Sequence, residues 1–389
     1  MHTDPLIFTI FLIFTGAAAL ATLALYTHQA MLVAYIVLGM LLGPSGVGLV
    51  QDAEFIQQVS SIGIMFLLFL LGLDLHPRKL AGLFKETTLV TGASSVLFAA
   101  LGTACGALLG FAWIESLIIG AALMFSSTII GLKLLPTRVL HHRHTGEIII
   151  SVLLLQDLIA IVILLILQAR GQGQTPLLQI LRVLLSLPGL ILFAWLFERY
   201  VLITLIRRFD KIHEYIFLLA IGWCLGVAEL ARALGLSHEI GAFIAGVTLA
   251  TSPIALYIAE SLRPLRDFFL VIFFFSLGAS IDLAILGDVL IPATLLAALV
   301  LTLKPLVFQF LLRSSGEALH RAREVGVRLG QISEFSLLIA VLALELGVIG
   351  RQASHLIQVS TLLTFIASSY FIVMRYPTPI AISDRLRRD

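Results

Sequence analysis

Charged side chains are scarce in this chain of 389 residues. Asp, Glu, Lys and Arg together make up 12% of the sequence, hydrophobic residues make up 59%, and the mean hydropathy is +1.06. A water-soluble domain of this length needs a more polar surface, so the composition excludes the ordinary soluble classes. Apolar stretches of about 20 residues, long enough to cross a ~30 Å hydrocarbon layer as a helix, recur along the whole chain.

Cysteine is almost absent too. The two cysteines, Cys105 and Cys224, both fall in apolar stretches and offer neither a disulfide framework nor metal-ligand spacing. The sequence also lacks a phosphate-binding loop, a metal cluster and a credible nucleophile triad. We therefore expect a protein that is not an enzyme, that binds no cofactor or nucleic acid through these residues, and whose surroundings are membrane lipids.

The apolar stretches predict an all-α polytopic membrane protein, because backbone groups in lipid must be hydrogen-bonded within their own segment. We predict about thirteen spans, at approximately 6–26, 30–49, 56–75, 86–111, 115–135, 146–168, 176–205, 212–232, 238–252, 267–286, 288–312, 324–347 and 354–374. Because no Lys or Arg precedes the first span, we expect it to be retained rather than cleaved as a signal peptide.

Basic residues alternate between the loops of this predicted arrangement. One set of loops holds most of them: Arg78, Lys79, Lys85, Arg138, Arg143, Arg207, Arg208, Lys211, Arg263, Arg266, Arg313, Arg321, Arg323, Arg375, Arg385, Arg387 and Arg388. The opposite loops hold only Arg170, Arg232 and Arg351. The positive-inside rule makes the basic side cytoplasmic, which puts the C-terminus inside and the N-terminus outside.

Thirteen spans permit two six-span halves of opposite orientation, joined by one linking span. This is the inverted-repeat plan of many secondary transporters. We predict a single transmembrane domain over 1–389, with a first repeat at 1–168, a linking helix at 169–211, a second repeat at 212–375 and a short basic cytoplasmic tail at 376–389. The plan makes spans five and twelve counterparts.

A carboxylate interrupts the sixth span, which reads "VLLLQDLIAIVILLILQ" from Val152 to Gln168. Asp157, preceded by Gln156, lies close to the middle of the bilayer, where inserting an aspartate costs roughly 2.5–3.5 kcal/mol. The structural alternative is an acid that pairs with a neighbouring helix for packing. A functional acid is favoured, because small residues normally supply packing in membranes. Such a group can hold a proton or a cation.

Spans five and twelve both contain a polar interruption. In "LIIGAALMFSSTIIGLKLLP" the residues Ser126, Ser127 and Thr128 are consecutive and indicate an unwound stretch with oxygens available to an ion. Hydroxyls that bond back to the preceding turn are the competing interpretation. In "VGVRLGQISEFSLLIAVLALELG" the interruption contains Gln331, Ser333 and Glu334. For Glu334 a structural pairing with Arg328 or another basic group is equally open.

Span eleven contains a lysine, Lys304 in "ATLLAALVLTLKPLVFQFLL". Its side chain could snorkel to the cytoplasmic interface. The alternative is a bond to Gln156, to Asp157 or to span twelve. In span nine, "SHEIGAFIAGVTLATS", Gly241, Ala245 and Gly246 predict a face for close helix packing.

Seven segments together resemble, in order, the membrane domain of Kef-type monovalent cation:proton antiporters. They are "GIMFLLFLLGLDLHPRKL", "MFSSTIIGLKLL", "VLLLQDLIAI", "LSHEIGAFIAGVTLATS", "FFFSLGASID", "LKPLVFQFLL" and "LGQISEFSLLI". The resemblance covers nearly the whole chain. It implies thirteen helices, a homodimer in the bacterial inner membrane, and a core domain that moves like an elevator against a dimerisation domain.

The same resemblance implies roles for single residues. Asp157 would be the shared proton and cation site, and Ser126, Ser127 and Thr128 would line the first of two crossing broken helices. Lys304 would be the family's membrane lysine, and Glu334 would belong to the second broken helix. The pair Gln156–Asp157 is similar to the potassium branch, whereas Asp-Asp or Asn-Asp pairs are typical of sodium exchangers.

Kef proteins usually continue into a cytoplasmic nucleotide-binding regulatory domain, which this sequence does not include. Three explanations stay open: a truncated chain, a separate regulatory chain, or an unregulated member. Nucleotide is expected only if such a separate domain or subunit exists.

The resulting hypothesis is electroneutral exchange of potassium for protons at one carboxylate. Two other functional classes compete with it. A ligand-gated potassium efflux channel would need a filter-like repeat, and none is visible. An intramembrane protease would need a second facing acid, for which Asp282 is the conceivable candidate.

Overall fold

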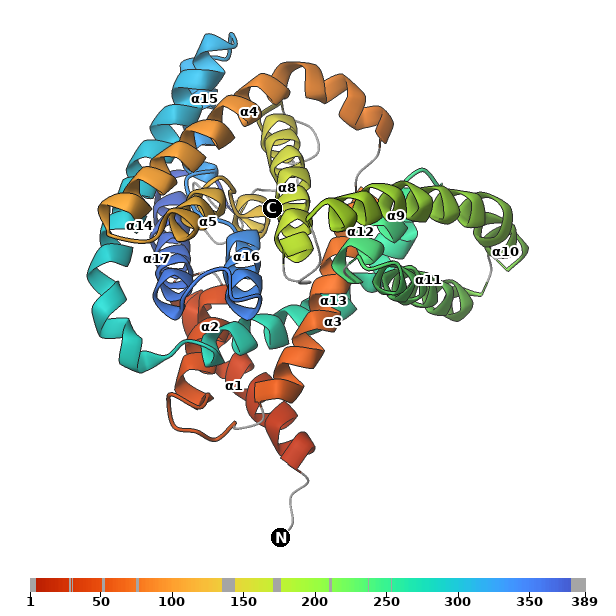
Figure 1. Cartoon of the computed structure of the whole chain (residues 1–389), viewed down its shortest axis with the longest axis horizontal. Helices are drawn as coiled ribbons and strands as arrows, with labels where there is room; N and C mark the ends of the chain where they lie inside the picture. Colours follow the sequence, from red (N-terminus) through yellow and green to blue (C-terminus); the bar gives the residue numbers. More distant parts are fainter. Residues whose placement is uncertain are drawn as a thin grey trace. The chain divides into compact units, whose positions relative to one another are not determined.

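The computed structural model describes residues 5–27, 29, 31–50, 53–74, 77–134, 144–170, 176–209, 212–236, 238–252 and 254–378 (Figure 1). Every regular element in these ranges is a helix, which confirms the all-α prediction. Of the features used to predict orientation, Arg138, Arg143, Lys211 and the tail from residue 379 onward lie outside the described residues.

The helices fall into two compact units that are interleaved in sequence. The first comprises residues 1–51, 82–164 and 277–389, and the second comprises 52–81 and 165–276. The first contains all or most of α1 (Pro5–Tyr26), α2 (Met31–Leu42), α4 (Pro77–Leu108), α5 (Trp113–Leu123), α6 (Thr128–Lys133), α8 (His144–Arg170), α14 (Leu283–Ser314), α15 (Leu319–Arg328), α16 (Glu334–Glu345) and α17 (Arg351–Arg375). The second contains all or most of α3 (Ala53–Asp74), α9 (Pro176–Phe197), the π-helix η1 (Glu198–Leu202), α10 (Ile203–Arg208), α11 (His213–Ala233), α12 (His238–Leu249) and α13 (Ala255–Ala279).

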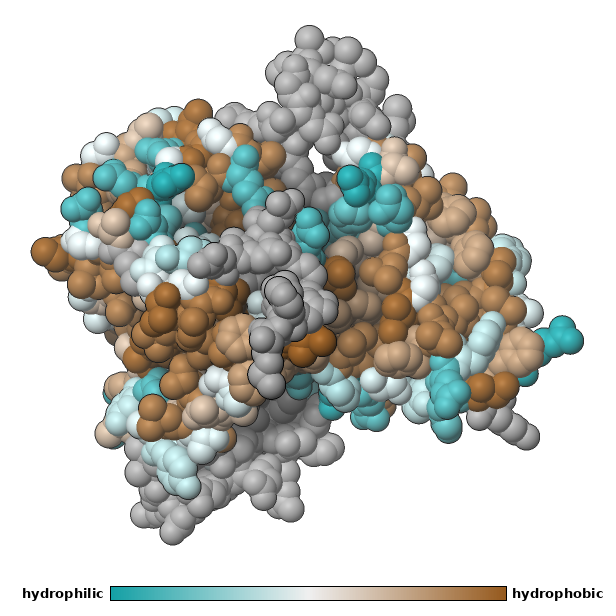
Figure 2. Space-filling model, turned by 90° about the horizontal axis from the view of Figure 1, so that it is seen from below, coloured by the Kyte–Doolittle hydropathy of each residue, from teal (hydrophilic) through white to brown (hydrophobic). Residues whose placement is uncertain are grey.

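Seven helical segments among the described residues are long and apolar enough to cross a membrane, and four shorter helical segments are also apolar. Apolar side chains cover much of the face shown in Figure 2. On α9, for example, Leu190 and Ala194 are buried, whereas Leu192 and Phe193 are exposed. A helix that is apolar on its outward face as well as its packed face suits a lipid environment. The thirteen-span arrangement stays a prediction.

The predicted tenth span, 267–286, runs past the end of its helix. Helix α13 begins earlier, at Ala255, and ends at Ala279. Asp282 then serves as the N-cap of α14, because its Oδ1 accepts a hydrogen bond from the amide of Ala284 at 2.9 Å. Aspartate is a strong N-cap residue, so a helix boundary lies where hydropathy alone shows continuous apolar sequence.

Both predicted helix breaks are present. Helix α5 ends at Leu123 and α6 begins at Thr128, while α15 ends at Arg328 and α16 begins at Glu334. Serines start the second half of each pair: Ser127 Oγ accepts from the amide of Ile130 and Ser333 Oγ accepts from the amide of Phe335, both at 3.1 Å. The hydroxyls thus satisfy amides that lack an intrahelical partner.

Helix α12 packs closely within the second unit, as its small residues predict. A side chain at Gly241 would meet the backbone of Val227 and Ala228 on α11, and one at Gly246 would meet the backbone of Phe69 and Gly72 on α3. The indole of Trp223 donates to the carbonyl of Ala245 at 3.1 Å. The prediction of a close-packing face on this helix is therefore confirmed.

A buried apolar cluster holds α8 in the first unit. It is formed by residues from α4, α8, α14 and α15 together with Leu329, which directly follows α15: Val90, Phe98, Ile148, Ile149, Val152, Leu153, Phe308, Leu312, Ala322, Val325 and Leu329. Within this cluster, the ring centroids of Phe98 on α4 and Phe308 on α14 lie 5.6 Å apart. This packing fixes the half of α8 that leads up to Gln156 and Asp157.

Helix α15 and the break that follows it approach α14 at Pro305, directly after Lys304. A Cβ atom placed on Gly326 would lie 2.5 Å from the Pro305 carbonyl oxygen, and one on Gly330 would lie 2.9 Å from the proline ring. Only glycine allows this backbone approach. The contact places the second break beside the lysine.

We predict that Gly326→Ala lowers the thermal unfolding midpoint in detergent, because the added methyl group meets backbone and overpacking costs about 1–3 kcal/mol. The matched control is Gly92→Ala on α4 in the same unit, where an added Cβ would meet nothing within 4 Å. Equal midpoints for the two variants would contradict the close approach.

Candidate functional site

Asp157 lies at the middle of the 27-residue helix α8 and is only 2% exposed. The hydroxyl of Thr128, at the start of α6, donates toward both carboxylate oxygens, with distances of 3.4 Å to Oδ1 and 3.2 Å to Oδ2. A carboxylate without a basic partner is costly in an apolar interior. The site therefore favours a state in which a proton or a cation accompanies this group.

Gln156 holds the first break in position. Its Oε1 accepts from the amide of Ser126 at 2.9 Å, and its Nε2 donates to the carbonyl of Met124 at 3.1 Å. Both ends of the side-chain amide are therefore engaged with unwound backbone. In this arrangement Gln156 positions the unwound backbone near Asp157, and its direct part in ion binding stays a prediction.

The two breaks are hydrogen-bonded to each other. Ser126 Oγ donates to the carbonyl of Leu329 at 2.8 Å, and Gln331 Nε2 lies 3.4 Å from the carbonyl of Ser127. Ser336, in the first turn of α16, bonds to the carbonyl of Ala122 at the end of α5. The hydroxyls of Ser126, Ser127 and Thr128 thus make tertiary or capping bonds, and the back-bonded alternative is wrong for them.

Lys304 joins both breaks from α14. Its Nζ donates to the carbonyl of Phe125 at 2.6 Å and to that of Gln331 at 3.2 Å, and it lies 5.2 Å from the centre of the Phe98 ring. The residue is 1% exposed. The snorkelling interpretation is therefore wrong. Of the predicted alternatives, the structure shows the bond to span twelve, through Gln331. It adds a bond to span five, through Phe125.

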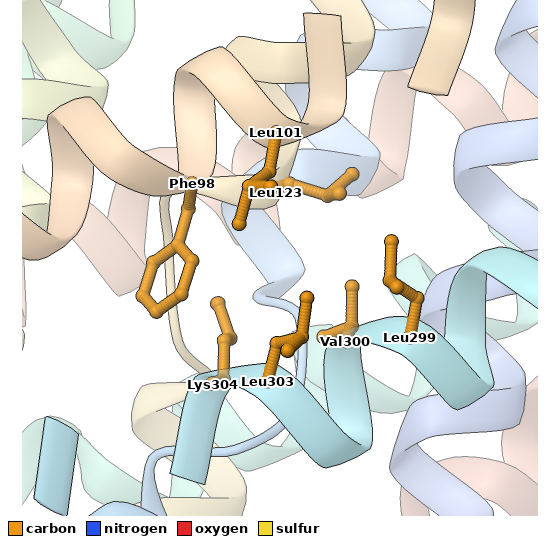
Figure 3. A pocket seen from close by; sticks show the side chains of 7 residues that line it. All are labelled: Phe98, Leu101, Leu123, Leu299, Val300, Leu303 and Lys304. Atoms are coloured by element: carbon orange, nitrogen blue, oxygen red, sulfur yellow. The ribbon is translucent and has the colours of Figure 1, made fainter. Parts of the chain in front are cut away.

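Apolar side chains enclose the stem of Lys304. A small pocket beside it is lined by Phe98 and Leu101 of α4, Leu123 of α5, and Leu299, Val300, Leu303 and Lys304 of α14 (Figure 3). The labelled side chains from α4 and α14 point toward one another across this pocket. Because Lys304 is buried, its ammonium group depends on the carbonyls of Phe125 and Gln331 for its hydrogen bonds.

Glu334 is the first residue of α16, directly after the cap Ser333, and is 5% exposed. It interacts electrostatically with Asp157. Two like charges in a buried site disfavour each other, so a cation or proton near them is favoured. The expected alternative partner, Arg328, pairs instead with Glu324, where its Nε lies 3.0 Å from Oε1.

The functional residues named from the sequence all belong to the first unit and meet at the two breaks: Ser126, Ser127, Thr128, Gln156, Asp157, Lys304, Gln331, Ser333 and Glu334. Figure 1 shows α5, α16 and α17 side by side within this unit. The arrangement can bind a desolvated cation or a proton at a carboxylate beside hydroxyl and carbonyl oxygens.

A family model described as "Sodium/hydrogen exchanger, transmembrane" matches residues 9–375. The chain belongs to this family. An iron transporter, MagA of Paramagnetospirillum magneticum, is 29% identical over 88% of this chain and 80% of its own length. The glutathione-regulated potassium-efflux proteins KefC of Salmonella schwarzengrund and of Klebsiella pneumoniae are each 30% identical over 93% of this chain.

The resemblance to Kef-type antiporters is thereby confirmed over most of the chain. The match spans 59% of the length of these KefC proteins. Family membership and the apolar helices together make this a multi-pass membrane protein.

The sequence analysis did not identify the hydroxyls of α17 that hydrogen-bond to the second break. Thr364 Oγ1 accepts from the amide of Ile332, and Ser368 Oγ donates to Oε1 of Gln331, both at 3.1 Å. The signal was present, because Thr361, Thr364 and Ser368 recur at helical spacing in an apolar helix and so lie on one face.

We predict that Gln156→Leu lowers the thermal unfolding midpoint strongly, because it leaves the Ser126 amide and the Met124 carbonyl without this partner. Each buried group left unsatisfied costs about 1–3 kcal/mol. The control is Gln309→Leu on α14, a partly exposed position outside the site. A Gln156→Leu protein as stable as the control would mean that the amide does not hold the break.

Proposed function

We propose that this chain is a secondary transporter that exchanges a monovalent cation, potassium, for protons. The carrying observation is Asp157, buried at the middle of α8 within hydrogen-bonding distance of Thr128 and beside two helix breaks that bond to each other. Membership of the sodium/hydrogen exchanger family supports cation/proton exchange. Transport, and not catalysis, is the activity we assign.

The proposed mechanism is competition at one carboxylate. With Asp157 ionised, a partly dehydrated cation binds between its oxygens and the oxygens near Ser127 and Thr128. With Asp157 protonated, the cation leaves. The site crosses the membrane only when the carboxylate is neutralised, because a bare charge is costly in a dry barrier. One site that holds either one cation or one proton gives electroneutral exchange.

Lys304 has a structural part in this proposal. Its bonds to Phe125 and Gln331 keep the two breaks together while the occupant of Asp157 changes. If Lys304 also released a proton during the cycle, the exchange would carry net charge. Voltage dependence therefore reports whether its proton takes part.

Potassium is the proposed cation for two reasons. The relatives that match 93% of this chain are named as potassium-efflux proteins, and Gln156 precedes Asp157 as in the potassium branch that the sequence resembles. The family name itself supports the alternative, a sodium/proton antiporter of the same fold. Carboxylate and hydroxyl oxygens suit either hard cation.

We further propose the membrane arrangement that the sequence predicts: thirteen helices, two inverted repeats and elevator-type alternating access. The finding that all named site residues share one compact unit supports movement of that unit as a body. The proposed setting is a homodimer in the bacterial inner membrane, with the N-terminus outside and the C-terminus cytoplasmic. A cytoplasmic nucleotide-binding regulatory domain or subunit is the proposed additional partner.

The test is exchange in proteoliposomes with a pH-sensitive dye inside. Potassium, sodium and choline are added outside in turn, with and without a potential clamp, for wild type and Asp157→Asn. We expect a potassium-driven pH change that is insensitive to voltage and lost in Asp157→Asn, because asparagine cannot alternate between a proton and a cation.

Asp288→Asn on α14 is the matched control, since that carboxylate is exposed, and it should exchange as wild type does. Thermal unfolding of Asp157→Asn shows that the variant is folded. Exchange by Asp157→Asn would refute the shared-carboxylate mechanism. A sodium preference would establish the alternative cation, and a membrane potential that tracks potassium without a pH change would establish a channel.

A further inference from the structure

Arg328, the last residue of α15, is 1% exposed and uses all of its nitrogens. Nε pairs with Glu324 at 3.0 Å, Nη1 donates to the carbonyl of Leu134 at 3.0 Å, and Nη2 donates to the carbonyl of Pro377 at 2.9 Å. Its guanidinium also lies 5.6 Å from the centre of the Tyr376 ring. One buried side chain thus holds three separate stretches of the chain.

These stretches have distinct positions in the first unit. Leu134 directly follows α6, the helix that starts with Thr128. Tyr376 and Pro377 directly follow α17, the last helix among the described residues, and are called the chain exit below. Glu324 lies one turn earlier on α15 itself. Arg328 therefore connects the far end of the first broken helix to the chain exit.

The backbone around Arg328 is part of the second break. Its own carbonyl accepts from Gln331 Nε2 at 3.0 Å, and the next carbonyl, that of Leu329, accepts from Ser126 Oγ at 2.8 Å. A shift of Arg328 must therefore be accommodated by both breaks. Through α6 and Ser126 it reaches the oxygens that face Asp157.

Arginine suits this position for a chemical reason. Its planar guanidinium has five donors in a fixed geometry and stays charged at any pH that a protein experiences. Lysine carries its three donors on a single nitrogen, so it cannot span acceptors that face three separate nitrogens of a planar guanidinium. The connection is thus rigid, and it responds to displacement of its partners.

We propose that Arg328 is a positioning residue that couples the chain exit at Tyr376 and Pro377 to the ion site. Displacement of the exit moves the end of α6 and the second break together and so alters the affinity for the transported cation. This inference rests on the proposed exchange at Asp157.

The transport test uses Arg328→Gln, Arg328→Lys and Tyr376→Ala in the proteoliposome assay. We expect the half-saturating cation concentration to rise about tenfold in Arg328→Gln, because bonds to a buried charged group are lost. The maximal rate should change much less, a split that general destabilisation does not produce. Tyr376→Ala should also raise the half-saturating cation concentration. In the double variant its effect should not add to that of Arg328→Lys.

Arg321→Gln is the matched control, because Arg321 lies on the same helix and pairs with Glu317 at a more exposed place. It should leave half-saturation unchanged. If wild type exchanges cations and Arg328→Gln and Tyr376→Ala both keep wild-type half-saturation, the coupling is refuted while the proposed function stands. If Arg328→Gln does not fold, Arg328→Lys and Tyr376→Ala decide the question.

Hydrogen–deuterium exchange gives a readout that does not depend on transport. Tyr376→Ala should increase exchange of the amides of Gly131 and Leu134 in and directly after α6, although the substituted residue lies on another segment. Unchanged deuterium uptake at these amides would overturn the coupling, even if the wild-type protein shows no cation/proton exchange. Suppose that Tyr376→Ala speeds deuterium uptake in α6 while the wild-type protein does not transport cations. That result would support the coupling and refute only the proposed function.

Discussion

Buried backbone in the two helix breaks is the constraint on which the site depends. Several amides and carbonyls in residues 124–127 and 329–333 lie outside the regular hydrogen bonding of the helices, and most of these residues are buried. Side chains from three other helices supply partners for this backbone: Gln156 from α8, Lys304 from α14, and Thr364 from α17. The same side chains thereby gather oxygens around Asp157. The hydrogen bonds that stabilise the breaks are therefore the same bonds that build the site.

This constraint also explains why a costly lysine is retained in the interior. A buried ammonium loses its hydration, and only good hydrogen bonds offset that loss. Lys304 receives them from one carbonyl in each break. An apolar residue would remove the desolvation cost but would leave both carbonyls without this donor.

Much of this site could be predicted from single polar residues in apolar sequence, because each one must have a reason to be there. Asp157, Lys304 and the two serine-containing breaks were found in this way. Their partners were not, since backbone carbonyls such as that of Phe125 leave no mark in the sequence. Arg328 lacks the pairing with Glu334 that the sequence left open, for a similar reason. Its choice of Glu324 over Glu334 follows from helical spacing of four residues, whereas its bonds to Leu134 and Pro377 depend on tertiary packing.

The contact of Gly326 and Gly330 with Pro305 has a mechanical consequence. Interfaces made of long side chains can slide, because rotatable bonds absorb the displacement. Here backbone lies against backbone and a proline ring, and neither has a side-chain torsion that can yield. Helices α14 and α15 are therefore expected to translate together as one stiff pair. Any sliding that opens the site must occur along surfaces lined by flexible side chains and not along this one.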